Sequence, residues 1–292
     1  MKIATSEAEV LSKLVQWASA EELIRVVLLE SSRANPNGLL DILSDYDITL
    51  IVSGVAPYVE SNTWTEGYGK PLLTVRDEVE VFDLRQYNCM VLYEDGTKID
   101  YIIWPLEVLD RIQKTGSLPD TLDVGYRVLL DKEQQARTLP SPTYTAHIPA
   151  KPAQQEFQNL IEEFWFCTTY VAKYLWRDEF MPVKVILDYE IKYLILRRLL
   201  EWRIELDHQW SVKPGFFGRG LERYLDAATW AEFEATYVGP AREENWRALF
   251  KTIDLFRRVA IEVGSALGYP YPHALDAQMV GYLEQIRQLD RH

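Results

Sequence analysis

The spacing of the hydrophobic residues changes near the middle of the chain. In the first half, short apolar runs alternate with polar turns, which predicts strands with a few helices between them. The clearest runs span residues 24–29, 44–52, 88–93, 98–103 and 126–131. In the second half, apolar residues recur every three or four positions, as in long helices, over residues 157–175, 185–200 and 246–263. The pattern therefore predicts an α+β chain, with a mixed-sheet domain followed by an all-α helical bundle.

Two proline pairs mark the boundary between these halves. They lie at Pro140 and Pro142 and at Pro149 and Pro152. Proline fixes its own φ and disfavours helix at the residue before it, so we expect a stiff, extended connector. The predicted organisation is an α/β domain over 1–135, a linker over 136–152 and a helical domain over 153–292.

Local signals place further elements in the first half. Ser6 is expected to cap a helix, and another helix is expected to start with Pro105 in its first turn. Residues 94–97 contain Asp-Gly between two apolar runs, which is a strong hairpin signal. Residues 54–69 are expected to be irregular, with Trp64 either stacking on a ligand ring or anchoring the loop in the core.

Composition narrows the class of protein. The 292 residues carry a net charge of −13 and are 48% hydrophobic, as in a globular chain. An acidic chain repels nucleic-acid phosphates and attracts cationic molecules. The sequence has no apolar run of about 18 residues and no secretory apolar segment, so we expect no membrane span. Cys89 and Cys167 lack metal or redox spacing, which favours free buried thiols and a cytoplasmic location.

Acidic residues mark the stretch with the clearest chemistry, residues 44–52. The two-residue period of a strand places Asp45 and Asp47 on one face and Ile48, Leu50 and Val52 on the other. Two carboxylates at the start of an apolar strand repel each other and lose hydration, and Mg²⁺ would offset both costs. Asp100, early in the run 98–103, is a candidate third ligand. The alternative is a turn in which Asp45 caps and Asp47 is solvated.

Two other polar segments are candidates for binding. The run 24–29 leads into small, turn-forming residues over 30–38, where backbone N–H groups can face an anion. In the second half, polar residues interrupt the helical pattern. They are Lys184, Asp188, Glu190, Lys192 and Glu201. From the residues alone, a solvated ladder of ion pairs explains this second group most simply.

Several segments together resemble a known family. They are SSRANPNGLLDILSDYDITLIV (31–52), EDGTKIDYIIWP (94–105), LLDKEQQ (129–135), MPVKVILDYEIKYLILRRLLEWRIELD (181–207), SVKPGFFGRGLERYL (211–225) and LFRRVAIEVGSALGYPYP (255–272). In this order they are similar to the streptomycin (aminoglycoside 6-) adenylyltransferases of the nucleotidyltransferase superfamily. The resemblance covers nearly the whole chain.

The resemblance implies a reaction and a set of residues. It implies transfer of AMP from Mg-ATP to a hydroxyl of an aminoglycoside such as streptomycin, with release of pyrophosphate. Two Mg²⁺ ions would be held by Asp45, Asp47 and Asp100. The phosphates would be bound by Ser31, Ser32 and Arg33, with support from Lys213 and Arg219. The general base would come from the helical domain, with Asp188 as first choice and Glu190 and Glu201 after it.

Two positions depart from the family pattern. Ser31 stands where the family usually has glycine, and Phe216 stands where it usually has lysine. Glycine allows positive φ and close approach of the backbone to phosphate, so both changes bear on nucleotide binding. They motivate an alternative, a protein that binds nucleotide or a small molecule without aminoglycoside activity, or that acts on another acceptor. The expected partners are ATP and a cationic small molecule, with no nucleic acid or membrane and a monomeric state favoured.

Overall fold

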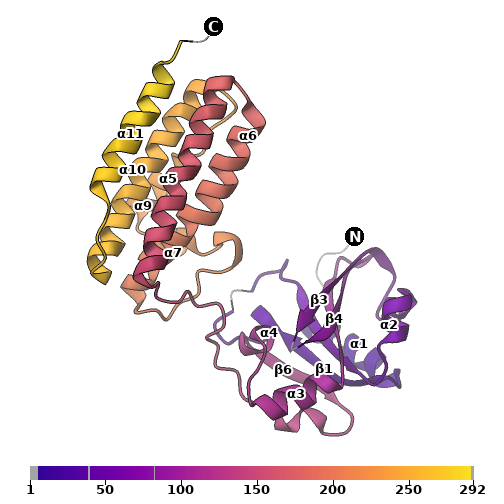
Figure 1. The fold of residues 1–292 in the computed structure, drawn as a ribbon. Helices are drawn as coiled ribbons and strands as arrows, with labels where there is room; N and C mark the ends of the chain where they lie inside the picture. Colours follow the sequence, from indigo (N-terminus) through magenta and orange to yellow (C-terminus); the bar gives the residue numbers. More distant parts are fainter. Residues whose placement is uncertain (1–5, 39, 82, 291–292) are drawn as a thin grey trace. The chain divides into compact units, whose positions relative to one another are not determined.

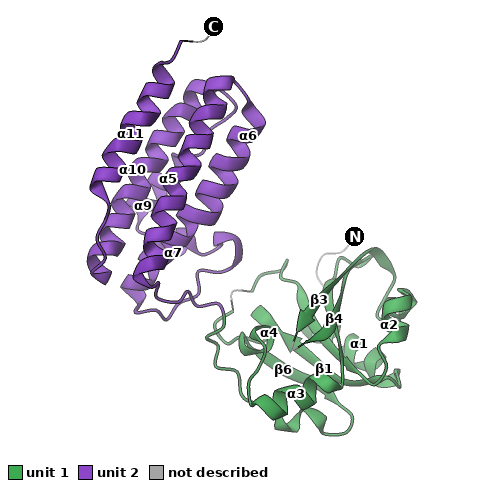
Figure 2. Cartoon of the chain, in the orientation of Figure 1, with its two compact units in different colours: residues 1–146 green, residues 147–292 purple. Residues whose placement is uncertain are grey.

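The computed structural model describes residues 6–38, 40–81 and 83–290. The chain forms two compact units, residues 1–146 and 147–292, shown in two colours in Figure 2. Among the helices of the described residues, none has the length and apolar character needed to cross a membrane.

Unit 1 is built on a six-stranded mixed sheet with the order β3-β4-β5-β2-β1-β6. Within this sheet β2 and β5 run parallel and the other neighbouring strands are antiparallel. Strands β1, β3, β4 and β6 are labelled in Figure 1. The strands are β1 (Ile24–Glu30), β2 (Tyr46–Val52), β3 (Pro71–Val81), β4 (Leu84–Tyr93), β5 (Lys98–Pro105) and β6 (Tyr126–Asp131). The strands predicted near 24–29, 44–52, 88–93, 98–103 and 126–131 are thereby confirmed.

Helices cover both faces of this sheet. On one face lie α1 (Glu7–Ala20), α2 (Ala56–Glu60) and η2 (Thr63–Gly67). On the other lie α3 (Glu107–Thr115), α4 (Asp120–Asp123) and η3 (Gln135–Thr138). The expected cap of α1 is present, since the Ser6 hydroxyl accepts from the Glu9 N–H and the Glu9 carboxylate accepts from the Ser6 N–H.

The side chains of β2 alternate between two hydrophobic clusters. Ile48, Leu50 and Val52 pack in the cluster that contains α1. Ile51 packs in the cluster that contains α3. The period-two prediction for this stretch is therefore correct, and Asp47, two and four residues before Thr49 and Ile51, shares their face.

Two expectations for unit 1 are wrong, and one strand was not predicted. Residues 54–69 are not irregular, because they contain α2 and η2, and Trp64 anchors them by stacking on Trp17 with ring centroids 6.0 Å apart. Pro105 ends β5, and α3 starts two residues later at Glu107. Edge strand β3 has no counterpart in the prediction, since its residues are mostly exposed and mix apolar with charged side chains.

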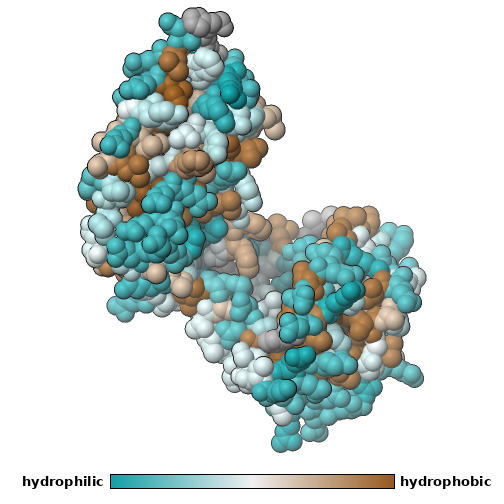
Figure 3. Space-filling model, viewed as in Figure 1, coloured by the Kyte–Doolittle hydropathy of each residue, from teal (hydrophilic) through white to brown (hydrophobic). Residues whose placement is uncertain are grey.

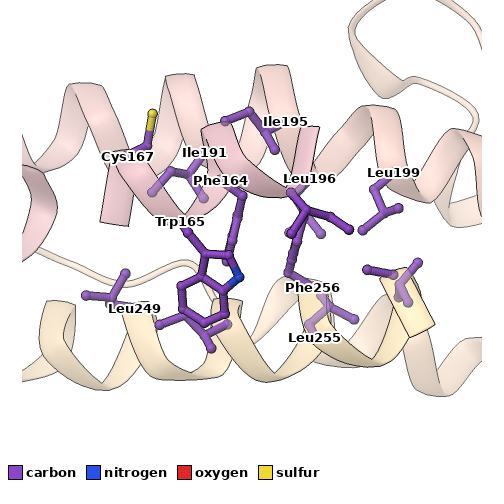
Figure 4. Close-up of a cluster of buried hydrophobic side chains, with 14 of the residues drawn as sticks. Phe164, Trp165, Cys167, Ile191, Ile195, Leu196, Leu199, Leu249, Leu255 and Phe256 are labelled. Carbon is purple, nitrogen blue, oxygen red and sulfur yellow. The ribbon is translucent and has the colours of Figure 1, made fainter. Parts of the chain in front are cut away.

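Unit 2 consists of helices around one apolar core. They are α5 (Gln154–Arg177), α6 (Phe180–Lys184), η4 (Val185–Leu196), α7 (Arg197–His208), η5 (Phe216–Gly218), α8 (Leu221–Tyr224), α9 (Ala227–Glu234), α10 (Arg242–Leu267) and α11 (His273–Gln288). The predicted helical bundle is therefore confirmed, although η4 is a π-helix. Phe164 of α5 and Phe256 of α10 stack with ring centroids 3.6 Å apart in this core (Figure 4).

On the face shown in Figure 3, hydrophilic side chains predominate and apolar patches lie between them. Large exposed hydrophobic residues include Leu72, Leu73 and Val75 of β3 in unit 1. In unit 2 they include Phe216 and Phe217 of η5. These two residues lie in the segment between α7 and α8, which also holds the predicted cations Lys213 and Arg219.

Ser31 turns the chain sharply after β1. It has φ +58°, in the left-handed region, and it begins η1 (Ser31–Arg33). Its N–H donates to the Gly125 carbonyl at 3.1 Å, and its own carbonyl accepts from the N–H groups of Ala34 and Asn35. This is the position where the sequence resemblance leads us to expect glycine, and the serine here occupies a backbone conformation that disfavours side chains.

We expect Ser31→Gly to be more stable than Ser31→Ala by about 1 kcal/mol, because both variants lose the hydroxyl and only alanine keeps a Cβ at positive φ. Urea unfolding of the two variants measures the difference. Equal stabilities, or a more stable alanine variant, would show that residue 31 does not need the left-handed conformation.

Candidate active site

Three predicted acidic residues, Asp45, Asp47 and Asp100, lie close to where the inner strands β2 and β5 begin, and we call this end of the sheet the acidic edge of unit 1. In the parallel pair, Asp47 of β2 lies directly opposite Asp100 of β5. Asp45 lies just before β2, which starts at Tyr46, so this residue precedes the strand to which it was assigned. The structure thus brings together residues that are more than 50 positions apart in the chain.

A lysine that the sequence analysis did not select joins these carboxylates. The Lys98 Nζ lies 2.6 Å from Asp45 Oδ2 and 3.2 Å from Asp100 Oδ2. Lys98 is two residues before Asp100 in β5 and so shares its face. This spacing in the motif EDGTKID is the signal that could have identified it.

Burial dominates the electrostatics of the two paired aspartates. The pKa of Asp47 is raised to about 6, first by burial and then by the negative charge of Asp100, while the Ser31 hydroxyl and Lys98 act in the opposite direction. Burial also raises the pKa of Asp100, against the effect of Lys98. One oxygen of Asp100, Oδ1, is buried and has no hydrogen-bond partner within the described part of the chain.

These features fit a divalent cation, although the present arrangement is an ion-pair cluster. A cation would offset the repulsion between Asp47 and Asp100 and would give the unpartnered oxygen of Asp100 a ligand role. Over the residues that the structure describes, no group of three or more His, Cys, Asp or Glu side chains is already arranged as a metal site. The lysine ammonium lies between Asp45 and Asp100 instead.

Arg33 holds the start of β2 in place. Its side chain is 8% exposed, and its Nε and Nη2 donate to the carbonyls of Asp45 and Ser44 at 2.9 and 2.6 Å. Its Nη1 donates to the Glu7 carboxylate at 2.9 Å, and its guanidinium lies 3.9 Å from the centre of the Tyr46 ring. Arg33 therefore positions the acidic segment, whereas its role in phosphate binding stays a prediction.

Glu30 is a second residue that the sequence analysis missed. It ends β1, is 1% exposed, and accepts a hydrogen bond from the Thr49 hydroxyl. Its pKa is raised to about 8, mainly by burial and also by the charge of Asp47, against the effect of the Thr49 hydrogen bond. The signal was present, since the period of two places Glu30 on the same face as buried Val26 and Leu28.

In unit 2, Asp188 lies in η4 between two lysines. Its two carboxylate oxygens each lie 2.6 Å from an ammonium, one of Lys184 and one of Lys192. Lys192 is fully buried, donates to the Thr236 carbonyl at 2.7 Å, and has its pKa lowered by burial. The solvated ladder suggested by the residue spacing is therefore wrong at Lys192, because this ion pair extends into the core.

The other acidic candidates of unit 2 have different partners. Glu201 pairs with Arg197, and burial raises its pKa. Glu190 accepts a hydrogen bond from the Cys167 thiol at 3.8 Å. The structure does not distinguish these residues or Asp188 as a base, and each assignment stays a prediction. The same holds for the phosphate-binding roles of Ser32, Lys213 and Arg219.

Glu30 makes stability depend on pH. Its folded pKa of about 8 exceeds the ordinary value of 4.5, so the folded state keeps a proton that the unfolded state releases. Rising pH therefore favours unfolding between about 4.5 and 8. We expect the free energy of unfolding to fall over this range in EDTA, and Glu30→Gln to fall less steeply. Urea titrations at several pH values test this, with exposed Glu78→Gln as the control. Equal slopes for Glu30→Gln and the unchanged chain would contradict the prediction.

Comparison with known proteins gives matches along the whole chain. The family model of streptomycin adenylyltransferase matches residues 4–286. Aminoglycoside 6-adenylyltransferase of Bacillus subtilis (strain 168) is 32% identical over 286 residues, which cover 96% of this chain and 98% of that protein. The protein of the same name from Campylobacter jejuni is 30% identical over 291 residues, covering 98% and 97%. A crystal structure of an aminoglycoside 6-adenyltransferase from Bacillus subtilis has a TM-score of 0.48 and 27% identity, covering 98% of this chain and 100% of that one.

The matched range, residues 4–286, covers most of both units and includes Asp45, Asp47, Lys98 and Asp100. The resemblance found in the sequence motifs is therefore confirmed by a match that extends well beyond those motifs. The chain belongs to the streptomycin adenylyltransferase family, whose members are adenylyl-transferring enzymes.

Proposed function

We propose that this chain transfers AMP from Mg-ATP to a hydroxyl of an aminoglycoside, streptomycin first, and releases pyrophosphate. The observation that carries the proposal is the register of β2 and β5, which sets Asp47 beside Asp100 in a chain of this family. Two similar proteins are named aminoglycoside 6-adenylyltransferases, which supports the acceptor class.

The nucleotide would bind at the acidic edge of unit 1. Asp45, Asp47 and Asp100 would hold the divalent cations, which we propose to be two Mg²⁺ ions. When bound, such ions stabilise the developing charge on phosphate and leaving group and favour ionisation of the attacking hydroxyl. The N–H groups of η1 that follow Ser31 would face the phosphates, with Lys213 and Arg219 of unit 2 as further cationic groups.

The acceptor would be bound and deprotonated by acidic groups of unit 2. Asp188 is the proposed general base, because a carboxylate within hydrogen-bond reach of the acceptor hydroxyl can take its proton. The ammonium groups of Lys184 and Lys192 hold this carboxylate in a fixed orientation. The net charge of −13 would favour approach of a polycationic aminoglycoside. Location in the cytoplasm and a monomeric state stay predictions.

Incubation with α-labelled ATP, Mg²⁺ and streptomycin tests the function. We expect label on the drug and stoichiometric pyrophosphate, with both dependent on Mg²⁺. Absence of labelled product across a panel of aminoglycosides would reject the assignment. Calorimetry with Mg-ATP then separates the alternatives. Nucleotide binding without transfer to an aminoglycoside favours an enzyme with another acceptor, or a binding protein. Absence of nucleotide binding favours a protein without nucleotide chemistry.

We expect Asp47→Asn to lower the rate of transfer by about 10²-fold or more, because it removes a charged ligand of the ions that stabilise the transition state. The thermal midpoint should not fall, since the variant also removes a buried charge beside Asp100. Initial rates and thermal unfolding measure the two effects.

Asp110→Asn is the matched control, because it makes the same change at an exposed position of α3 in the same unit. It should keep the rate of the unchanged chain. If Asp47→Asn retained most of the activity, the acidic edge of unit 1 would not be the catalytic centre.

A further inference from the structure

Lys98 pairs with two of the three carboxylates of the acidic cluster, which consists of Asp45, Asp47 and Asp100. Its ammonium lies within 3.2 Å of one oxygen on Asp45, which comes just before β2, and of one oxygen on Asp100, which is in β5. The opposed Asp47 and Asp100 bring a further negative charge to the same edge. A lysine ammonium and a divalent cation both bind carboxylate oxygens and repel each other, so they compete for Asp45 and Asp100.

The surrounding cations do not replace Lys98. The Arg33 guanidinium, which holds the start of β2, donates to backbone carbonyls and to Glu7 instead. Glu30, whose pKa is affected by the charge of Asp47, is acidic and so cannot neutralise the carboxylates. Lys98 is thus the cation that bridges Asp45 to Asp100 among the ion pairs of the described residues.

Lys98 also has the freedom to leave. Its side chain is 43% exposed, and a lysine carries a compact charge on a flexible four-carbon stem. Swinging the ammonium outward breaks two ion pairs without opening the hydrophobic core. A released ammonium at this edge would remain within one side-chain length of the carboxylates, where an anionic phosphate would meet it.

We propose that Lys98 is an exchangeable counter-ion, which holds Asp45 and Asp100 together and is displaced from them when a divalent cation binds. This inference rests on the proposed function, because it takes the acidic cluster as the cation site. It differs from a fixed ion pair, in which Lys98 would keep its contacts with Asp45 and Asp100 after the cation binds.

Titration of the full chain with Mn²⁺, followed by electron paramagnetic resonance without nucleotide or aminoglycoside, tests the proposal. We expect Lys98→Met to bind Mn²⁺ about tenfold more tightly than the unchanged chain, because it removes a competing charge next to two ligands. Lys70→Met is the matched control, since Lys70 pairs with Glu94 in the same unit at 2.6 Å and the net charge changes equally. It should bind Mn²⁺ as the unchanged chain does.

A second measurement needs no variant. Acetylation of the unchanged chain, read by mass spectrometry, should modify Lys98 faster when Mn²⁺ is added, whereas Lys70 should react at the same rate. Release from two carboxylates makes the amine easier for the reagent to reach.

The outcomes separate the inference from the proposed function. Equal or weaker Mn²⁺ binding by Lys98→Met, or unchanged acetylation of Lys98 once Mn²⁺ is bound, overturns the counter-ion role and leaves adenylyl transfer standing. Tighter binding by Lys98→Met together with faster acetylation of Lys98 in Mn²⁺ supports the role even if no aminoglycoside is modified. Absence of Mn²⁺ binding by both proteins overturns the role together with the proposed cation site.

Discussion

The parallel pairing of β2 with β5 is the constraint on which the acidic site depends. Parallel neighbours present corresponding ends at the same edge of a sheet, so residues near the start of each strand become neighbours in space. Register then sets Asp47 against Asp100 and places Lys98 near Asp45. Such a pair also needs a long crossover, and the chain supplies one through α2, η2 and the β3–β4 hairpin.

The groups around this pairing are costly to keep in a folded protein. Glu30 and Asp47 are carboxyl groups in positions where burial disfavours the charged form. Arg33 and Lys98 act against this cost in different ways. The first binds backbone carbonyls and fixes the entry to β2, whereas the second neutralises side chains directly. Several buried carboxyl groups with raised pKa values in one place are typical of catalytic sites, where activity is favoured over stability.

Much of this arrangement could be predicted from local sequence. The alternation of Ile48 and Leu50 with Asp47 fixed the two faces of β2, and Asp-Gly at 95–96 fixed the turn that leads to Asp100. The partners of Arg33 and Lys98 could not be predicted, because they depend on which strands become neighbours. Strand β3 was missed for another reason, since an exposed edge strand lacks the buried alternation that marks an inner one.

The same edge strand has a consequence for how copies of the chain behave in concentrated solution. An exposed strand with apolar side chains such as Leu73 and Val75 offers free backbone groups to other molecules and favours sheet-to-sheet aggregation. Here β3 also carries Arg76, Asp77, Glu78 and Glu80 in succession around Val79. The excess of negative charge makes two such edges repel each other, so these side chains act as gatekeepers against association.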